Sequence, residues 1–161
     1  MKRVLWTDPD NWASLIGRIT LSIVVFPHGA QKLFGWFDGN GYEGTMIFFT
    51  QHMQLPWIIG FLVILIETFA PVLLILGLAT RIAAFLIFVN FIGIISTTNF
   101  KNGFFMNWSM MPDTPEGYEY HLLILGVCIM LIIAGGGKAS IDAMITRNRN
   151  GIDYRTGKLS T

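Results

Sequence analysis

Charged residues are scarce in this sequence. They make up 13% of its 161 residues, about half the share that is usual in soluble domains. Apolar residues account for 53%, and the mean hydropathy is +0.56. A soluble domain of this length could not bury so much apolar surface, so the composition indicates that lipid surrounds the chain. The net charge of +1 gives no reason to expect nucleic acid as a partner.

Cysteine is almost absent as well. The single thiol, Cys128, lies inside an apolar run, which excludes an intramolecular disulfide and any Cys-x-x-Cys pair. We expect it to behave as a small buried hydrophobe, so thiol–disulfide chemistry would need a partner. The sequence also lacks an HExxH motif, a Walker loop and a GxGxxG after a strand, and no metal-ligand set is expected.

Four apolar segments are long enough to cross a membrane, which takes about 20 helical residues. They are expected at residues 12–33, 57–78, 82–98 and 118–136. No Ala-x-Ala-like cleavage site follows the first, so we expect it to stay in the membrane. The predicted fold is all-α: an integral membrane, antiparallel four-helix bundle formed by residues 1–142. Residues 143–161 form a polar, basic tail.

Lys and Arg are distributed unequally between the two ends of the predicted bundle. The end with both termini and the short turn at residues 79–81 holds nine: Lys2, Arg3, Arg18, Arg81, Lys138, Arg147, Arg149, Arg155 and Lys158. The opposite end holds only Lys32 and Lys101. Because cytoplasmic loops carry the excess of basic residues, both termini are expected in the cytoplasm.

Three spans carry a strongly polar residue deep inside, namely Arg18, Glu67 and Asn90. A charge at mid-bilayer costs at least about 2.5–3.5 kcal/mol, so each needs a partner or a function. Arg18 is the obvious partner of Glu67, with Asn90 completing the hydrogen bonds of a structural ion pair. The alternative is that Glu67 is a functional carboxyl that exchanges a proton with a ligand.

A second polar group is expected near the opposite membrane surface. His28 and Lys32 lie one helical turn apart, and His28 is about 24 Å along the helix axis from Trp12. Glu119 and His121 enter the fourth span from the same side. These four residues are therefore predicted at one depth, either as anchors or as a ligand site, and the two histidines could also ligate a haem.

The loop before the fourth span, FKNGFFMNWSMMPDTPEGYEY at residues 100–120, interleaves aromatic and polar residues. Aromatic residues at this density are typical of the headgroup region of a membrane. The loop is thus expected either to anchor the chain or to cover a lipid-soluble ligand or a partner protein.

Three segments carry a resemblance to a known family: HGAQKLFGW from residue 28, LPWIIGFLVILIETFAPVLLILGLATRIAA from residue 55, and EGYEYHLLILGVCIMLIIAGGGKASID from residue 116. Together they resemble the DoxX family of small four-helix bacterial membrane proteins, over about Gly17 to Asp142. One departure is Ala70-Pro71, where the family often has Gly-Gly, and it predicts a kink or altered packing in the second span.

The resemblance implies a place in the bacterial inner membrane and a link to redox chemistry. Family members include a membrane subunit similar to that of thiosulfate:quinone oxidoreductase, and others linked to sulfur, thiol or oxidative-stress complexes. We therefore expect a membrane subunit that interacts with quinone. Its partners would be lipid and either other membrane or periplasmic redox proteins or a second copy. The alternatives are a non-catalytic scaffold or accessory subunit, and transport, for which four short helices leave little room.

The predicted site follows from these expectations. Quinone carbonyls would be met by His28, Lys32 or His121, while Glu119 or Glu67 would move protons. The candidate catalytic residues are Glu67, Glu119 and His28. The candidate ligand-binding residues are His28, Lys32, Arg18, Asn90, His121 and Arg81.

Overall fold

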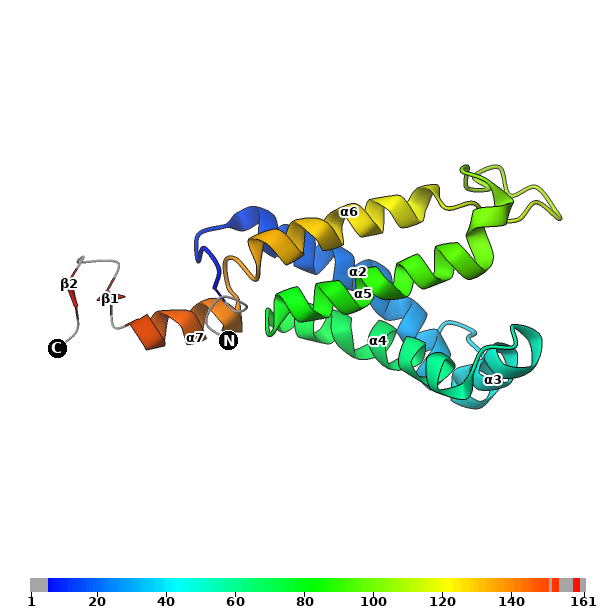
Figure 1. The fold of residues 1–161 in the computed structure, drawn as a ribbon, viewed down its shortest axis with the longest axis horizontal. Helices are drawn as coiled ribbons and strands as arrows, with labels where there is room; N and C mark the ends of the chain where they lie inside the picture. The colour runs from blue at the N-terminus through cyan, green and yellow to red at the C-terminus, as the bar shows by residue number, and fades with distance from the viewer. Residues whose placement is uncertain (1–5, 151, 154–157, 160–161) are drawn as a thin grey trace.

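The computed structural model describes residues 6–150, 152, 153, 158 and 159. Its four longest helices are α2 (Trp12–Phe34), α4 (Trp57–Leu76), α5 (Thr80–Ile94) and α6 (Glu119–Ala134). They run side by side, with α2 packed against α4 and α6, and α5 packed against the other faces of α4 and α6 (Figure 1). Apart from the paired two-residue strands β1 (Ile152–Asp153) and β2 (Lys158–Leu159), the regular structure described is helical, as predicted.

Three helical segments are long and apolar enough to cross a membrane, so the chain is a membrane protein. They are Trp12–Phe34, Trp57–Leu76 and Thr80–Asn102. The third joins α5 to a π-helix, η2 (Ile95–Asn99), and a 3-10 turn, η3 (Phe100–Asn102), so it exceeds the predicted 82–98 at both ends. The fourth predicted span, 118–136, contains α6, whose 16 residues extend over only about 24 Å.

Local signals explain where the first two long helices begin and end. The Asn11 side chain accepts a hydrogen bond from the Ser14 amide at 3.1 Å and caps the start of α2. Gly35 ends α2 and Gly77 ends α4, both in the left-handed conformation. At Gly77 a side chain is also excluded sterically, because its Cβ would lie 2.7 Å from Arg18 Nη1.

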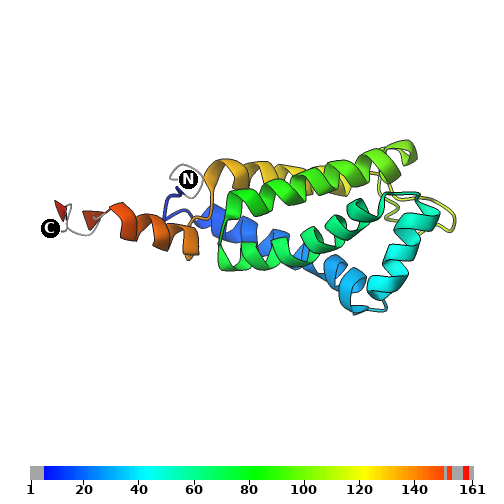
Figure 2. The same cartoon turned by 60° about the horizontal axis from the view of Figure 1, so that its bottom comes forward.

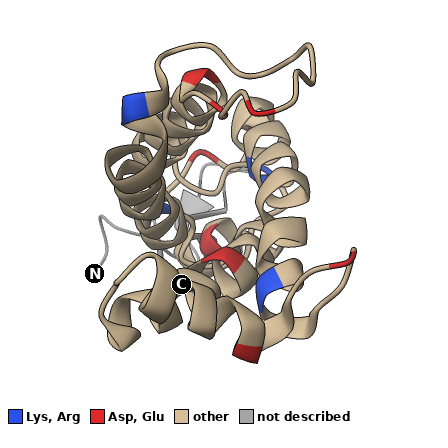
Figure 3. Ribbon diagram, turned by 90° about the vertical axis from the view of Figure 1, so that its right-hand side faces the viewer, with Lys and Arg blue, Asp and Glu red and all other residues tan. Residues whose placement is uncertain are grey.

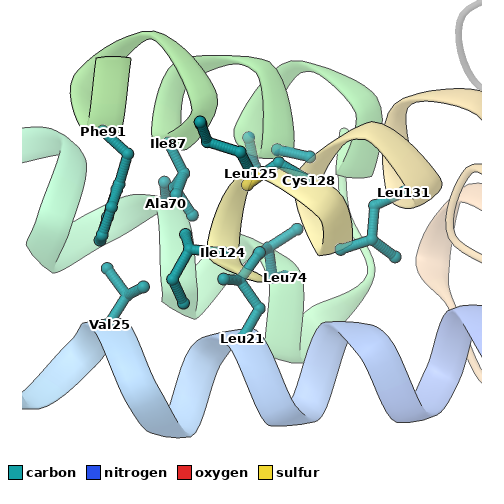
Figure 4. Close-up of a cluster of buried hydrophobic side chains, with 12 residues drawn as sticks. Leu21, Val25, Ala70, Leu74, Ile87, Phe91, Ile124, Leu125, Cys128 and Leu131 are labelled. Atoms are coloured by element: carbon teal, nitrogen blue, oxygen red, sulfur yellow. The ribbon is translucent and has the colours of Figure 1, made fainter. Parts of the chain in front are cut away.

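Apolar side chains pack inside the bundle and also cover its outside. The interior cluster is drawn from all four long helices (Figure 4) and includes Leu21, Val25, Ala70, Leu74, Ile87, Phe91, Ile124, Leu125, Cys128 and Leu131. Cys128 is fully buried in it, as expected. Large apolar residues such as Ile23, Phe85 and Leu123 are exposed on the outside. An apolar exterior of this kind suits contact with lipid.

The two ends of the bundle differ. The terminal end carries the first described residues, 6–11, and α7 (Ile141–Asn150). The loop end carries α3 (Gly41–Ile47), the π-helix η1 (Phe48–His52) and the connection from α5 to α6 (Figures 1 and 2). Figure 3, which looks onto the loop end, shows charged residues at scattered positions on an otherwise uncharged ribbon. Lys2, Arg3 and Arg155, which were counted at the terminal end, lie outside the described residues.

Candidate functional site

The buried carboxylate of Glu67 is paired with Lys32. Lys32 Nζ lies 2.6 Å from Glu67 Oε2, and Asn90 Nδ2 donates to Glu67 Oε1 at 3.0 Å. The predicted pair of Glu67 with Arg18 is therefore wrong, whereas the predicted hydrogen bond from Asn90 is found. Three helices, α2, α4 and α5, each supply one of these side chains.

Helix geometry explains how Lys32 reaches inward. Side chains of a helix lean toward its N-terminus, so a lysine near the end of α2 extends back along the helix toward the membrane interior. Lys32 Nζ accordingly lies 3.4 Å from the carbonyl oxygen of His28, one turn earlier. Lys32 thus points toward the carboxylate of Glu67 and does not act as a simple surface anchor.

Gly29 and Pro71 bring α2 and α4 together at this level. Pro71 has no N–H, so the Glu67 carbonyl lacks its usual helical donor. The backbone of α2 fills the space beside it, because a Cβ on Gly29 would lie only 2.3 Å from Glu67 O and 2.6 Å from the Thr68 nitrogen. The close approach of the two backbones sets the distance over which Lys32 meets Glu67.

The two members of the ion pair differ in exposure. The Glu67 side chain is 3% exposed, while that of Lys32 is 25% exposed. A carboxylate so deeply buried depends on its two donors to offset the loss of water. The ammonium group keeps part of its hydration, which lowers the cost of burying the pair.

Two histidines lie beside the pair. His28 interacts electrostatically with Lys32 and Glu67, and His121 of α6 interacts with His28. The His121 ring packs against Phe91, with 5.6 Å between ring centroids. Its Nδ1 is buried and has no hydrogen-bond partner within the described part of the chain. We call the five residues His28, Lys32, Glu67, Asn90 and His121 the polar cluster.

Glu119 makes its contacts elsewhere. Its Oε2 accepts hydrogen bonds from the Met106 amide at 3.3 Å and from Trp108 Nε1 at 3.2 Å. These bonds hold the aromatic loop between α5 and α6, and none of the hydrogen bonds described for Glu119 goes to the polar cluster. The expected grouping of Glu119 with His28, Lys32 and His121 is therefore not found.

Arg18 holds the terminal end of the bundle together. Its five N–H donors go to the carbonyls of Gly136, Leu74, Ile75, Lys138 and Ala139, at 2.7–3.2 Å. These carbonyls belong to the last turn of α4 and to the connection between α6 and α7, where helix ends leave acceptors without partners. Arg18 is fully buried and has no donor left for a ligand.

Arg81, another predicted ligand residue, also lies at the terminal end, where its Nη2 donates to the Trp6 carbonyl at 3.1 Å. Sequence reasoning missed the role of Asp142 nearby. Its two carboxylate oxygens accept from the amides of Ala79 and Thr80 at 2.8 and 2.9 Å and cap the start of α5. The only signal for this contact was the Asp at the end of the Gly-rich segment after α6.

Comparisons with known proteins connect this arrangement to a family. The DoxX family model matches residues 13–100, which contain four of the five residues of the polar cluster. A protein of Bacillus subtilis (strain 168) named "Putative oxidoreductase CatD" is 29% identical over 136 residues, covering 84% of this chain and 89% of that protein. No solved structure matches the chain significantly.

Proposed function

This chain belongs to the DoxX family, and from that membership we propose that it is the membrane subunit of a redox complex that interacts with quinone at the polar cluster. The relative named as an oxidoreductase supports the reaction class. The quinone itself is inferred from the chemistry of the cluster and from its position among apolar helices.

The observation that carries the proposal is a buried carboxylate with two imidazoles beside it. Interconversion of a quinone and its quinol moves two protons together with two electrons. Carboxyl and imidazole groups in an apolar site are suited to transfer such protons. Glu67 is the proton-exchanging group, and Lys32 and Asn90 hold its carboxylate in place.

The cluster also has a group free to bind the substrate. A quinone carbonyl accepts hydrogen bonds, and His121 Nδ1 is a buried atom without a partner in the described structure. In the tautomer with a proton on Nδ1, His121 donates to that carbonyl. The exposed His28, one helical turn before Lys32 on α2, is the second imidazole that we assign to proton transfer. The residues present therefore fit a quinone head group.

Electrons must come from outside the chain. The lone buried thiol of Cys128 cannot form a disulfide within the chain. We assign the electron donor to a membrane or periplasmic redox protein, or to a soluble thiol or reduced sulfur compound. The chain then contributes the quinone site, its protonation and its position in the bilayer.

We further propose that α6 is a fourth span and completes an antiparallel four-helix bundle in a bacterial inner membrane. Residues 1–142 form this domain and include the start of α7, and residues 143–161 form a basic tail that contains the rest of this helix. The nine-to-two distribution of Lys and Arg supports a cytoplasmic terminal end. Since α6 covers only about 24 Å, residues on both sides of it complete the crossing.

Purification from native membranes tests the proposal. Lipid extracts of the purified complex are expected to contain quinone, and membranes supplied with a thiol or reduced sulfur donor are expected to reduce a short-chain quinone analogue. An E67Q variant should lose this activity, whereas E43Q, a matched change in the short helix α3, should keep it. Absence of both bound quinone and turnover, with native partners present, would exclude the proposal. A haem absorption band in the same preparation would show that the ligand is haem and not quinone.

The aromatic loop favours a second candidate function, that of an accessory subunit. Phe105 and Trp108 are 75% and 73% exposed at the loop end, where a partner protein could dock. Alanine substitutions at Phe104, Phe105 and Trp108, followed by affinity capture from native membranes, test this function. Unchanged capture of the partner proteins would contradict docking through the loop.

A further inference from the structure

We infer that Glu67 exchanges its proton with the aqueous phase at the loop end only, by way of the partly exposed side chain of Lys32. This inference rests on the proposed function for its purpose, because it states the side from which the protons of quinone reduction are taken. It can nevertheless be measured without any turnover.

The open route begins at the ion pair. Lys32 Nζ lies 2.6 Å from Glu67 Oε2, the Lys32 side chain is 25% exposed, and Lys32 lies in the last turn of α2, at the loop end. The groups around Glu67 are His28 and Lys32 on α2, the neutral amide of Asn90 on α5, and His121 on α6 next to His28. Because Lys32 contacts the carboxylate directly, water bound to the exposed part of Lys32 is one hydrogen-bonded step from Glu67.

The opposite route is closed by apolar side chains. Seven residues of α4, or about 10 Å, separate Glu67 from Leu74, whose carbonyl binds Arg18. Fully or almost fully buried residues fill this layer (Figure 4): Leu21, Val25, Ala70, Leu74, Ile87 and Cys128. A layer packed from all four helices leaves little space for a chain of water molecules.

The polar groups of this layer do not provide a proton path either. Thr68 Oγ1 donates to Ile64 O at 2.8 Å, and Ser22 Oγ is within 2.9 Å of the Arg18 and Pro71 carbonyls. A backbone carbonyl that accepts such a hydrogen bond has no proton of its own to pass on, so these hydroxyl groups do not continue a proton-transfer chain. Among the described residues of the layer, the thiol of Cys128 is the one titratable side chain, and it lies within the apolar cluster.

Arg18 closes the terminal end. Its guanidinium remains charged in proteins and therefore cannot pass on a proton. With all five donors engaged, it also repels hydronium ions approaching from the terminal end. The positive charge of Arg18 thus lies on the terminal side of the apolar layer, and the carboxylate of Glu67 lies on its loop side.

Labelling with dicyclohexylcarbodiimide tests this sidedness. This apolar reagent reacts with protonated carboxyl groups inside membranes, and mass spectrometry identifies the modified Glu67 peptide. The full chain is reconstituted in liposomes whose inner and outer pH are set independently. A C-terminal affinity tag separates vesicles that carry the terminal end inside from those that carry it outside.

We expect lowering the loop-end pH by one unit to raise the labelling rate of Glu67 about tenfold. Changing the terminal-end pH should leave the rate unchanged. The E67Q variant, which keeps the amide acceptor for Asn90, should give no adduct at this position. A K32M variant removes the cation that favours the ionised form, so it should be labelled faster than the unmodified chain at neutral pH.

Labelling that follows the terminal-end pH, or both sides equally, would overturn the inference. Absence of any adduct in both the unmodified chain and K32M would overturn it as well, since Glu67 would then not be protonated from either side. One-sided labelling, together with absence of both bound quinone and turnover in native membranes, would leave the inference intact and refute the proposed function. Quinone turnover together with two-sided labelling would support the proposed function and refute the one-sided access to Glu67.

Discussion

The contact between Gly29 and the backbone of Glu67 gives a sharp prediction. Replacing Gly29 by Ala puts a methyl group 2.3 Å from Glu67 O and 2.4 Å from the Glu67 carbonyl carbon. An ordinary van der Waals contact is about 3.5 Å, so α2 and α4 must separate locally by about 1 Å. Overpacking of this kind costs about 1–3 kcal/mol.

The separation also weakens the ion pair. A shift of about 1 Å lengthens the 2.6 Å contact between Lys32 and Glu67 to beyond the range of a direct hydrogen bond. Loss of a hydrogen bond between charged groups removes about a further 1.5–3 kcal/mol. We therefore expect G29A to lower the thermal stability of the detergent-solubilised protein and to speed labelling of Glu67 by dicyclohexylcarbodiimide.

Gly93 provides the matched control. It also lies inside a spanning helix, but a Cβ there would meet nothing within 4 Å. G93A should be neutral or stabilising by up to about 1 kcal/mol, because alanine is the better helix former. Equal melting temperatures for G29A and G93A, together with unchanged labelling of Glu67, would refute the claim that Gly29 sets the geometry of the site.

Three further predictions concern the charged residues. K32M leaves Glu67 without its cation and should cost about 3 kcal/mol, whereas the double variant K32M/E67Q should recover much of that loss in a thermal melt. R18M removes every donor from five carbonyls and should abolish accumulation of the folded protein. R18K keeps three donors and should retain part of this accumulation. Equal accumulation of the two variants would contradict the role of Arg18. D142A should cost about 1–2 kcal/mol through loss of the cap on α5, and D142N should cost less, because one amide oxygen remains an acceptor.

The ends of the long helices were largely predictable where their signals are local. Asn11 caps the start of α2 and Gly35 caps its end, so the helix covers Trp12–Phe34. The predicted segment, 12–33, is one residue shorter. The start of α5 was predicted two residues late. Its first amides are capped by Asp142, more than 60 residues further along the chain, and a window over the segment itself does not contain that residue.

The partners of the buried charges were not predictable in the same way. Pairing Glu67 with Lys32 depends on the relative height of α2 and α4, which is set by Gly29 against the Glu67 carbonyl. Periodicity along one helix does not define that height. Arg18 binds backbone carbonyls, and these carry no sequence signature, so a carboxylate in a neighbouring span was a natural but wrong choice.

The histidines and Glu119 show the same limit. The positions of His28 and His121 in their spans predicted that both lie near one membrane surface, and in the fold the charge of His28 acts on His121. It also placed Glu119 there, but the fold of the aromatic loop brings Trp108 to that carboxylate instead. Depth in a membrane can be read from a sequence, whereas the direction of a side chain depends on the loops that pack around it.

Quinone reduction by native membranes that carry E67Q is the most direct test of the central role given to Glu67. The amide retains the acceptor for Asn90, so the variant should fold and assemble with its partners at a normal level. We predict that its turnover with a quinone analogue falls at least about a hundredfold, the usual effect of removing a proton-transferring group. Turnover equal to that of the unmodified chain, at equal abundance in the membrane, would contradict the account.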